Sequence, residues 1–233
     1  MKQTIFFLIA TISTVLFAEP VRSMLGADGS SIVQTDGHDL PDGIVAVEFL
    51  ESTGTQWIET GIFPSSDYEY EGDFSYVGSS PNGTQYFAGV LNSGGLSGNF
   101  LIRINSAHRI LFDTPQYSYE LGLVTENLQW MHLESGYSYF GGVNLYRDWT
   151  QWNINQTLVL FCRRAGNGKI YNLTNGIRIG NFMISRNRDM LLNLVPVRFL
   201  NENDEWEGAM YDLVSGELFL NQGSGNFIIG PDL

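Results

Sequence analysis

Three acidic residues alternate with other residue types in the segment Glu69-Tyr-Glu71-Gly-Asp73. In an extended strand, residues two positions apart point to the same face, so these carboxylates are expected to share one face. Retaining hydrolysis of a glycosidic bond needs two carboxyl groups about 5 Å apart, and alternate strand positions can supply that spacing. A wetted strand face would show the same pattern without catalysis. The triplet is therefore a candidate catalytic group, with an ordinary surface strand as the alternative.

The densest group of aromatic residues lies between positions 137 and 152. An aromatic ring can cover the apolar C–H face of a sugar while neighbouring polar side chains bind the hydroxyl groups. Core packing of the two tryptophans is the alternative, because it is the more frequent fate of large aromatic residues. The carbohydrate-binding residues predicted from this segment are Tyr146, Arg147, Asp148, Trp149 and Trp152.

The sequence lacks the residue combinations that are typical of other catalytic and metal-binding sites. The chain has three histidines but no His-x-x-x-His pair, no paired cysteines and no serine elbow, so neither a zinc site nor a serine nucleophile is predicted. We expect His132 to be a hydrogen-bonded structural residue. No Asp-x-Asp-x-Asp-Gly loop is present, so no cofactor is predicted, although calcium could use the oxygen-bearing residues near turns: Asp36, Asp39, Asp42, Asn201, Asn203 and Asp204.

The charge of the chain narrows the range of partners. It carries 12 basic and 25 acidic residues, a net charge of −13, and no run of Lys or Arg. Nucleic acids and anionic lipid surfaces are bound through clustered positive charge, so the composition argues against both. Neutral glycans, divalent cations and basic protein surfaces remain compatible with the sequence.

The N-terminus has the pattern of a secretory signal peptide. Met1-Lys2 precedes an apolar run from Ile5 through Phe17 that is too short and too broken for a membrane span. We predict a signal peptide over residues 1–23, with cleavage after Ser23 or after Ala18. Secretion to the periplasm, the cell surface or the medium follows, without membrane insertion after cleavage.

The remainder divides into a lead-in and one folded unit. Residues 24–43 are rich in Gly, Ser, Asp and Thr and are predicted to be a flexible linker, with a domain over residues 44–233. Short alternating runs such as Phe100–Asn105 and Gln129–Glu134 are separated by glycine and asparagine, with no stretch of helical periodicity. This pattern predicts an all-β fold, a two-sheet antiparallel β-sandwich.

Several segments together resemble one protein family. Ser215-Gly216 separates two runs that we expect to pair as a hairpin, and Gly223-Ser-Gly225 is expected to reverse the chain again into a meander. With Phe49-Leu-Glu-Ser-Thr-Gly-Thr-Gln-Trp57 and Trp130-Met-His132-Leu, these segments resemble the concanavalin-like (laminin-G-like) jelly-roll modules of bacterial surface proteins and phage structural proteins. The resemblance covers about residues 44–230.

The resemblance implies a jelly-roll sandwich with a binding or structural role and without catalytic activity. Laminarinase-type glycosidases on the same fold use an acid triplet, but the order Glu-x-Glu-x-Asp in residues 69–73 departs from theirs. The predicted function is a secreted, non-catalytic module that binds carbohydrate or another cell-surface component. A structural or adhesive module that binds protein and a divergent glycoside hydrolase are the alternatives.

Overall fold

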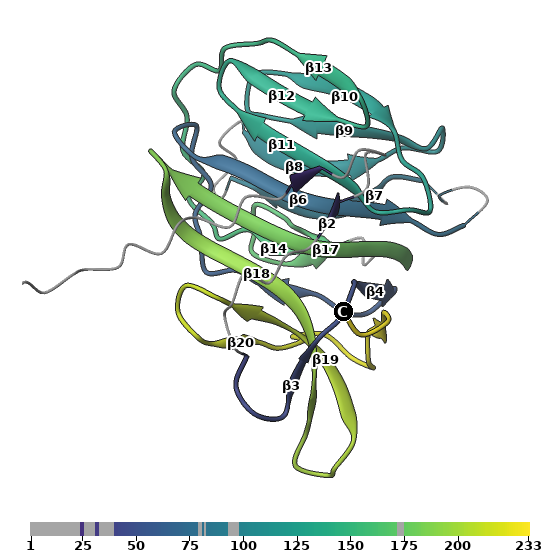
Figure 1. The fold of residues 1–233 in the computed structure, drawn as a ribbon. Helices are drawn as coiled ribbons and strands as arrows, with labels where there is room; N and C mark the ends of the chain where they lie inside the picture. The colour runs from purple at the N-terminus through teal and green to yellow at the C-terminus, as the bar shows by residue number, and fades with distance from the viewer. Residues whose placement is uncertain are drawn as a thin grey trace, which may run out of the picture.

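The computed structural model describes residues 24–25, 31–32, 40–78, 81, 83–92, 98–171 and 175–233. All regular elements in these ranges are β-strands, and all but the two short strands before residue 40 form two large sheets that pack face to face (Figure 1). The predicted all-β sandwich is therefore confirmed. Among the described residues there is no helix with the length and apolar character needed to span a membrane.

The smaller sheet has the strand order β10-β9-β8-β7-β14-β5, with β15 and β16 beside it. Its pairings are antiparallel except for one bridge between β15 and β7. The strands are β5 (Ile58–Glu59), β7 (Gln85–Leu91), β8 (Asn99–Ile104), β9 (Arg109–Asp113), β10 (Ser118–Leu123), β14 (Val159–Leu160), β15 (Arg163–Arg164) and β16 (Ile170–Tyr171).

The larger sheet has the order β13-β12-β11-β6-β17-β18-β19-β20, and β3, β4 and β21 join it beside β17 and β18. The hairpin of β18 and β19 projects away from the rest of the molecule at the bottom of Figure 1. The strands are β3 (Ile44–Ala46), β4 (Leu50–Thr53), β6 (Glu69–Tyr76), β11 (Gln129–Glu134), β12 (Tyr137–Phe140), β13 (Val143–Leu145), β17 (Asn175–Arg186), β18 (Asp189–Leu200), β19 (Trp206–Asp212), β20 (Leu218–Phe219) and β21 (Ile228–Ile229).

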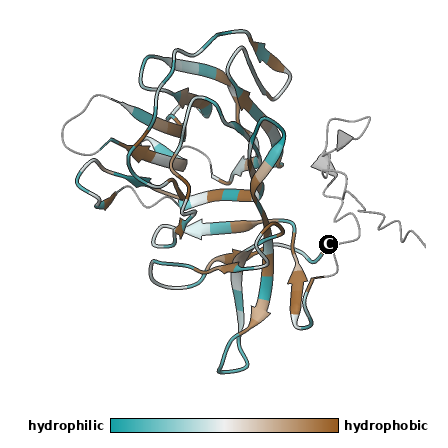
Figure 2. Cartoon of the chain, turned by 90° about the vertical axis from the view of Figure 1, so that its left-hand side faces the viewer, coloured by the Kyte–Doolittle hydropathy of each residue, from teal (hydrophilic) through white to brown (hydrophobic). Residues whose placement is uncertain are grey.

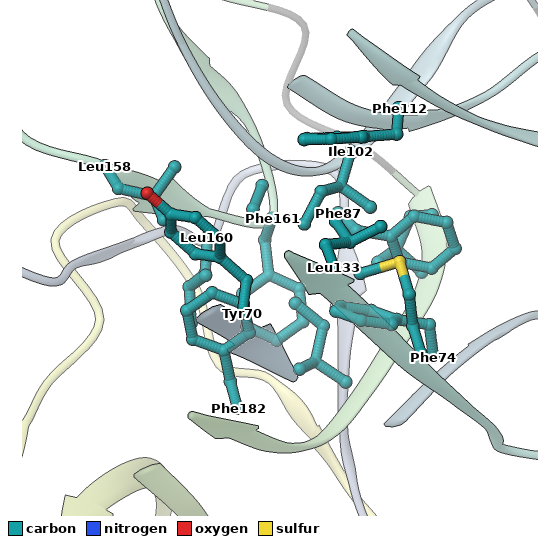
Figure 3. Packing of buried hydrophobic residues seen from close by; sticks show 14 of the residues in the cluster. Tyr70, Phe74, Phe87, Ile102, Phe112, Leu133, Leu158, Leu160, Phe161 and Phe182 are labelled. Carbon is teal, nitrogen blue, oxygen red and sulfur yellow. The ribbon is translucent and has the colours of Figure 1, made fainter. Parts of the chain in front are cut away.

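The core lies between the two sheets and is rich in aromatic residues (Figure 3). Phe74 of β6 meets Phe87 of β7 across the sandwich, with ring centroids 5.0 Å apart, and Tyr70 meets Phe100 at 4.4 Å. The strands show alternating hydrophilic and hydrophobic bands because successive side chains point to opposite faces (Figure 2). Cys162 is fully buried in this core, and burial raises the pKa of its thiol.

The C-terminal segment confirms the predicted hairpin, with a connection over residues 213–217 in place of Ser215-Gly216 alone, and it corrects the predicted meander. β19 and β20 pair with Met210 opposite Phe219, and Gly216 in their turn has a φ of 75°, which favours glycine. The last strand, β21, does not continue beside β20. It pairs with β4, because Gly230 packs against the backbone of Phe49 and seats the C-terminal strand there.

The outer face of the larger sheet carries a second apolar cluster at β18 and β19. Val195, Val197 and Ala209 form a second buried cluster, against which Leu40 and Ile44 pack. Leu40, which lies inside the predicted linker, therefore packs against the sheet. The two-residue strands β1 (Met24–Leu25) and β2 (Ser31–Ile32) also lie in this segment and pair with each other. The predicted signal peptide lies outside the described residues.

We expect the chain from Leu40 onward to fold without the residues before it. Residues 24–39 contain few bulky apolar side chains, so their removal should cost little burial. Limited proteolysis should trim the protein to the region of Leu40 to Ile44 and stop. A trimmed product that no longer unfolds cooperatively in urea would contradict this boundary.

Candidate functional site

The register of three neighbouring strands groups functional side chains on the outer face of the larger sheet. Glu71 of β6 lies opposite His132 of β11, and His132 lies opposite Tyr139 of β12. The residues on either side of His132, Met131 and Leu133, are fully buried in the core. Because side chains alternate along a strand, Glu71, His132 and Tyr139 therefore point outward in one row.

Five rings continue this row into an aromatic strip. Trp130 lies 5.2 Å from Tyr139 and 5.7 Å from His132, measured between ring centroids. His132 lies 5.7 Å from Tyr137, which lies 5.5 Å from Tyr146. We call these five residues the outer-face strip. Tyr146 is 72% exposed, while the other four side chains are half-buried.

Carboxylates and an amide hold the rings of the outer-face strip in place. The indole Nε1 of Trp130 donates a hydrogen bond to Glu71 Oε2 at 3.3 Å. His132 lies between two acids, with Nδ1 3.3 Å from Glu71 Oε1 and Nε2 3.4 Å from Glu134 Oε1. The Tyr137 hydroxyl donates to Asn144 Oδ1 at 2.8 Å. Rings fixed in this way lose little conformational entropy when a ligand binds.

The two acids also raise the pKa of His132. Burial of the imidazole lowers this pKa, but the hydrogen bonds and negative charges of Glu71 and Glu134 together outweigh burial. The protonated imidazole is therefore favoured in the folded protein relative to the unfolded chain. It balances part of the negative charge that these acids bring to the strip.

The raised pKa of His132 predicts a pH-dependent contribution to stability. A group whose pKa is higher in the folded state contributes fully below its unfolded pKa of about 6.5, and that contribution is lost as pH rises through the folded value. Urea denaturation at pH 6 and pH 8 should therefore show a larger stability gain toward pH 6 for the wild type than for His132→Gln. An equal pH response of the two proteins would contradict this coupling.

The acid triplet shares one strand face, as predicted, but its members differ in environment. Glu69 accepts a hydrogen bond from Ser185 Oγ at 3.3 Å, and Glu71 holds Trp130 and His132. Asp73 is only 2% exposed, so the expectation of a wetted face is wrong at this position. The backbone at Glu48 and the side chain of Leu128 close over the sheet there, near Gly180.

The structure divides the predicted carbohydrate-binding residues among three places. Tyr146 belongs to the outer-face strip. Arg147 and Asp148 are exposed and line a groove of about 540 Å³, together with Tyr119 of β10 and Tyr117, which precedes that strand. The aromatic residues of this groove are therefore not the predicted ones, since Tyr146, Trp149 and Trp152 do not line it.

Trp149 and Trp152 do not present their rings to solvent, which corrects their predicted role. They are 8% and 6% exposed, and their rings pack on Phe112 and Phe100 at 5.4 and 6.0 Å. The segment that carries them crosses the end of the sandwich, where Ser65 pairs with Asn153. Both rings fill the opening between the sheets, because that opening is lined by core aromatic residues.

Sequence reasoning missed four members of the outer-face strip: Trp130, His132, Tyr137 and Tyr139. A signal was present, since Trp130, His132 and Glu134 alternate with apolar residues in the sequence. Alternation alone does not tell which strands are neighbours, so the acids of residues 69–73 and the rings of residues 137–146 could not be joined to them.

No metal centre is found in the part of the chain that the structure describes. In those ranges no three His, Cys, Asp or Glu side chains lie close enough to hold an ion. Asp36 and Asp39, considered above for calcium, lie outside the described residues.

Comparison with known proteins shows the fold. No protein-family model and no curated protein matches this chain. Among solved structures, it is similar to a protein from Bacteroides ovatus described as a "putative carbohydrate binding protein", with a TM-score of 0.50 and 11% sequence identity. The match covers 80% of this chain and 60% of the other, so this chain spans about 60% of that protein's length.

Proposed function

We propose that this protein is a non-catalytic glycan-binding module of the concanavalin-like type, and that it binds through the outer-face strip. The observation that carries the proposal is the run of five neighbouring rings beside hydrogen-bonded carboxylates. Rings can stack on the C–H faces of successive sugars, while Glu134 and Asn144 accept hydrogen bonds from hydroxyl groups. The structural neighbour described as carbohydrate binding supports the same class of function.

The proposed ligand is a neutral glycan. The chain carries a net charge of −13, and Glu69, Glu71 and Glu134 lie on the face of the strip. The negative charge of these carboxylates would repel a sulfated or phosphorylated glycan, whereas it would not repel a neutral glycan. The proposal includes secretion, which rests on the signal-like segment before residue 24.

A glycan array tests the proposal directly. The purified chain from Leu40 onward should bind one group of neutral oligosaccharides, and binding should persist at 0.5 M salt because stacking is not screened. Binding that is confined to charged glycans and disappears with salt would contradict the assignment. An array without any signal would favour the alternative of a module that binds protein.

The hydrolase alternative is opposed by the environment of the acids. Asp73 is buried, and Glu71 already accepts from Trp130 and contacts His132, so neither is free to approach a glycosidic bond as it stands. A reducing-sugar assay on β-glucans should therefore show no product. Hydrolysis that disappears in Glu69→Gln or Glu71→Gln would overturn the non-catalytic assignment.

A further inference from the structure

The outer face of the larger sheet carries a pocket of about 360 Å³ beside the outer-face strip. Its lining includes Ser75 of β6, Arg178 of β17, Phe49, and Leu128 from the turn before β11. This volume is at the lower end of the range for small-molecule sites, so it suits one small polar unit rather than a long chain.

The strand register places the pocket next to one end of the strip. Trp130 lies opposite Asp73, and Ser75 follows two positions further along β6 on the same face. Two residues of strand advance about 7 Å. Leu128 likewise precedes Trp130 by two positions. The pocket therefore lies beyond Trp130, at the end of the strip opposite Tyr146, with Leu128 and the backbone of Glu48 between the pocket and the strip.

The walls of the pocket are braced. The Nε of Arg178 donates to Glu51 Oε2 at 2.7 Å, and its guanidinium lies 4.2 Å from the ring centroid of Phe49. Near Gly180, Leu128 and the carbonyl of Glu48 approach the sheet within van der Waals distance. These contacts set a boundary at the end of the strip, because the segments around Phe49 and Leu128 rise above the strand face.

A buried hydroxyl group at this pocket has no partner. Ser75 is 0% exposed, and its Oγ makes no hydrogen bond to any described residue. An unsatisfied buried polar atom costs stability, and native proteins have few of them. A sugar hydroxyl group entering the pocket would supply the missing partner once the side chains that cover Ser75 Oγ shift aside.

From this arrangement we propose that the pocket binds the terminal residue of a neutral glycan, whose next residues lie along the outer-face strip. The protein then recognises the ends of glycan chains and not their internal segments. This inference rests on the proposed glycan-binding function. It also assigns a direction to the bound glycan. The terminal sugar lies between Phe49, Ser75 and Arg178, and the following sugars run from Trp130 toward Tyr146.

The substitution Ser75→Ala separates a role in binding from a role in folding. A lost hydrogen bond of ordinary strength should weaken affinity about three- to tenfold. Urea stability should be unchanged or higher, because the hydroxyl has no partner in the free protein. Ser215→Ala, in the exposed turn between β19 and β20, is the matched control and should change neither quantity.

The ligand's ends provide the second test, by calorimetry with neutral hexasaccharides of glucose, mannose and galactose. Each hexasaccharide is compared in three forms. One form is unmodified, one carries a bulky aromatic tag at the reducing end, and one carries a bulky acetal at the non-reducing end. We expect one block to abolish binding and the other to leave it intact. Ser75→Ala should then weaken only forms whose recognised end is free.

The outcomes distinguish this inference from the function on which it rests. If both blocked forms and Ser75→Ala bind like their parents while Trp130→Ala does not bind, end recognition is overturned and glycan binding stands. If the wild type binds none of the hexasaccharides, both are overturned.

Discussion

Trp130→Ala is expected to weaken glycan binding by about 30-fold or more while the protein stays folded. Trp130 lies at the end of the outer-face strip opposite Tyr146, contacts His132 and Tyr139, and donates a hydrogen bond to Glu71. Tryptophan is enriched among the residues that contribute about 2 kcal/mol or more to binding, which corresponds to roughly a 30-fold change in affinity. Calorimetry with an array-selected oligosaccharide measures the effect.

Trp206→Ala is the matched control for this substitution. Trp206 is also partly exposed, at 43%, but it lies on β19 beneath the guanidinium of Arg198, away from the strip. Its loss should leave affinity unchanged. Equal affinities for wild type and Trp130→Ala would remove the outer-face strip as the binding site, and a response to Trp206→Ala alone would move the site to the projecting hairpin.

Trp149→Ala is expected to lower the free energy of unfolding by about 3–5 kcal/mol. The ring is buried between Phe112 and Trp152 at the end of the sandwich, so its removal leaves a cavity in addition to the lost burial. The measurement is the midpoint and slope of urea denaturation. Affinity of the protein that remains folded should be unchanged, because the ring does not reach the surface.

Tyr146→Ala is the informative comparison, because it lies three residues away but is 72% exposed. Surface substitutions usually change stability by less than about 0.5 kcal/mol, so this variant should lose affinity and keep its stability. The reverse result, with Trp149→Ala stable and weakly binding, would restore the tryptophan as a ligand contact and show that the end of the sandwich opens in solution.

The fold class could be predicted because it depends on local patterns. Alternating runs such as Gln129–Glu134 and frequent turn glycines indicate paired strands wherever they occur. The turn at Gly216 is equally local, since a tight turn there needs a positive φ, and the hairpin of β19 and β20 forms as expected.

Long-range pairing could not be predicted in the same way. β21 lies next to β4 although about 175 residues separate them, and the sequence suggested a neighbour close in the chain. Likewise, the bulge in β17 between Ile179 and Phe182 shifts the alternation, so both residues point into the core. Such irregularities follow from packing against strands that are distant in sequence.

The candidate site shows the same division. The sequence by itself determined that Trp130, His132 and Glu134 share one face, because a strand alternates with period two. Only the tertiary structure decided that this face meets Glu71 and Tyr139, and that Trp149 and Trp152 turn inward. Residue type and spacing act within one strand, whereas strand register and burial depend on contacts between segments that fold together from opposite ends of the chain.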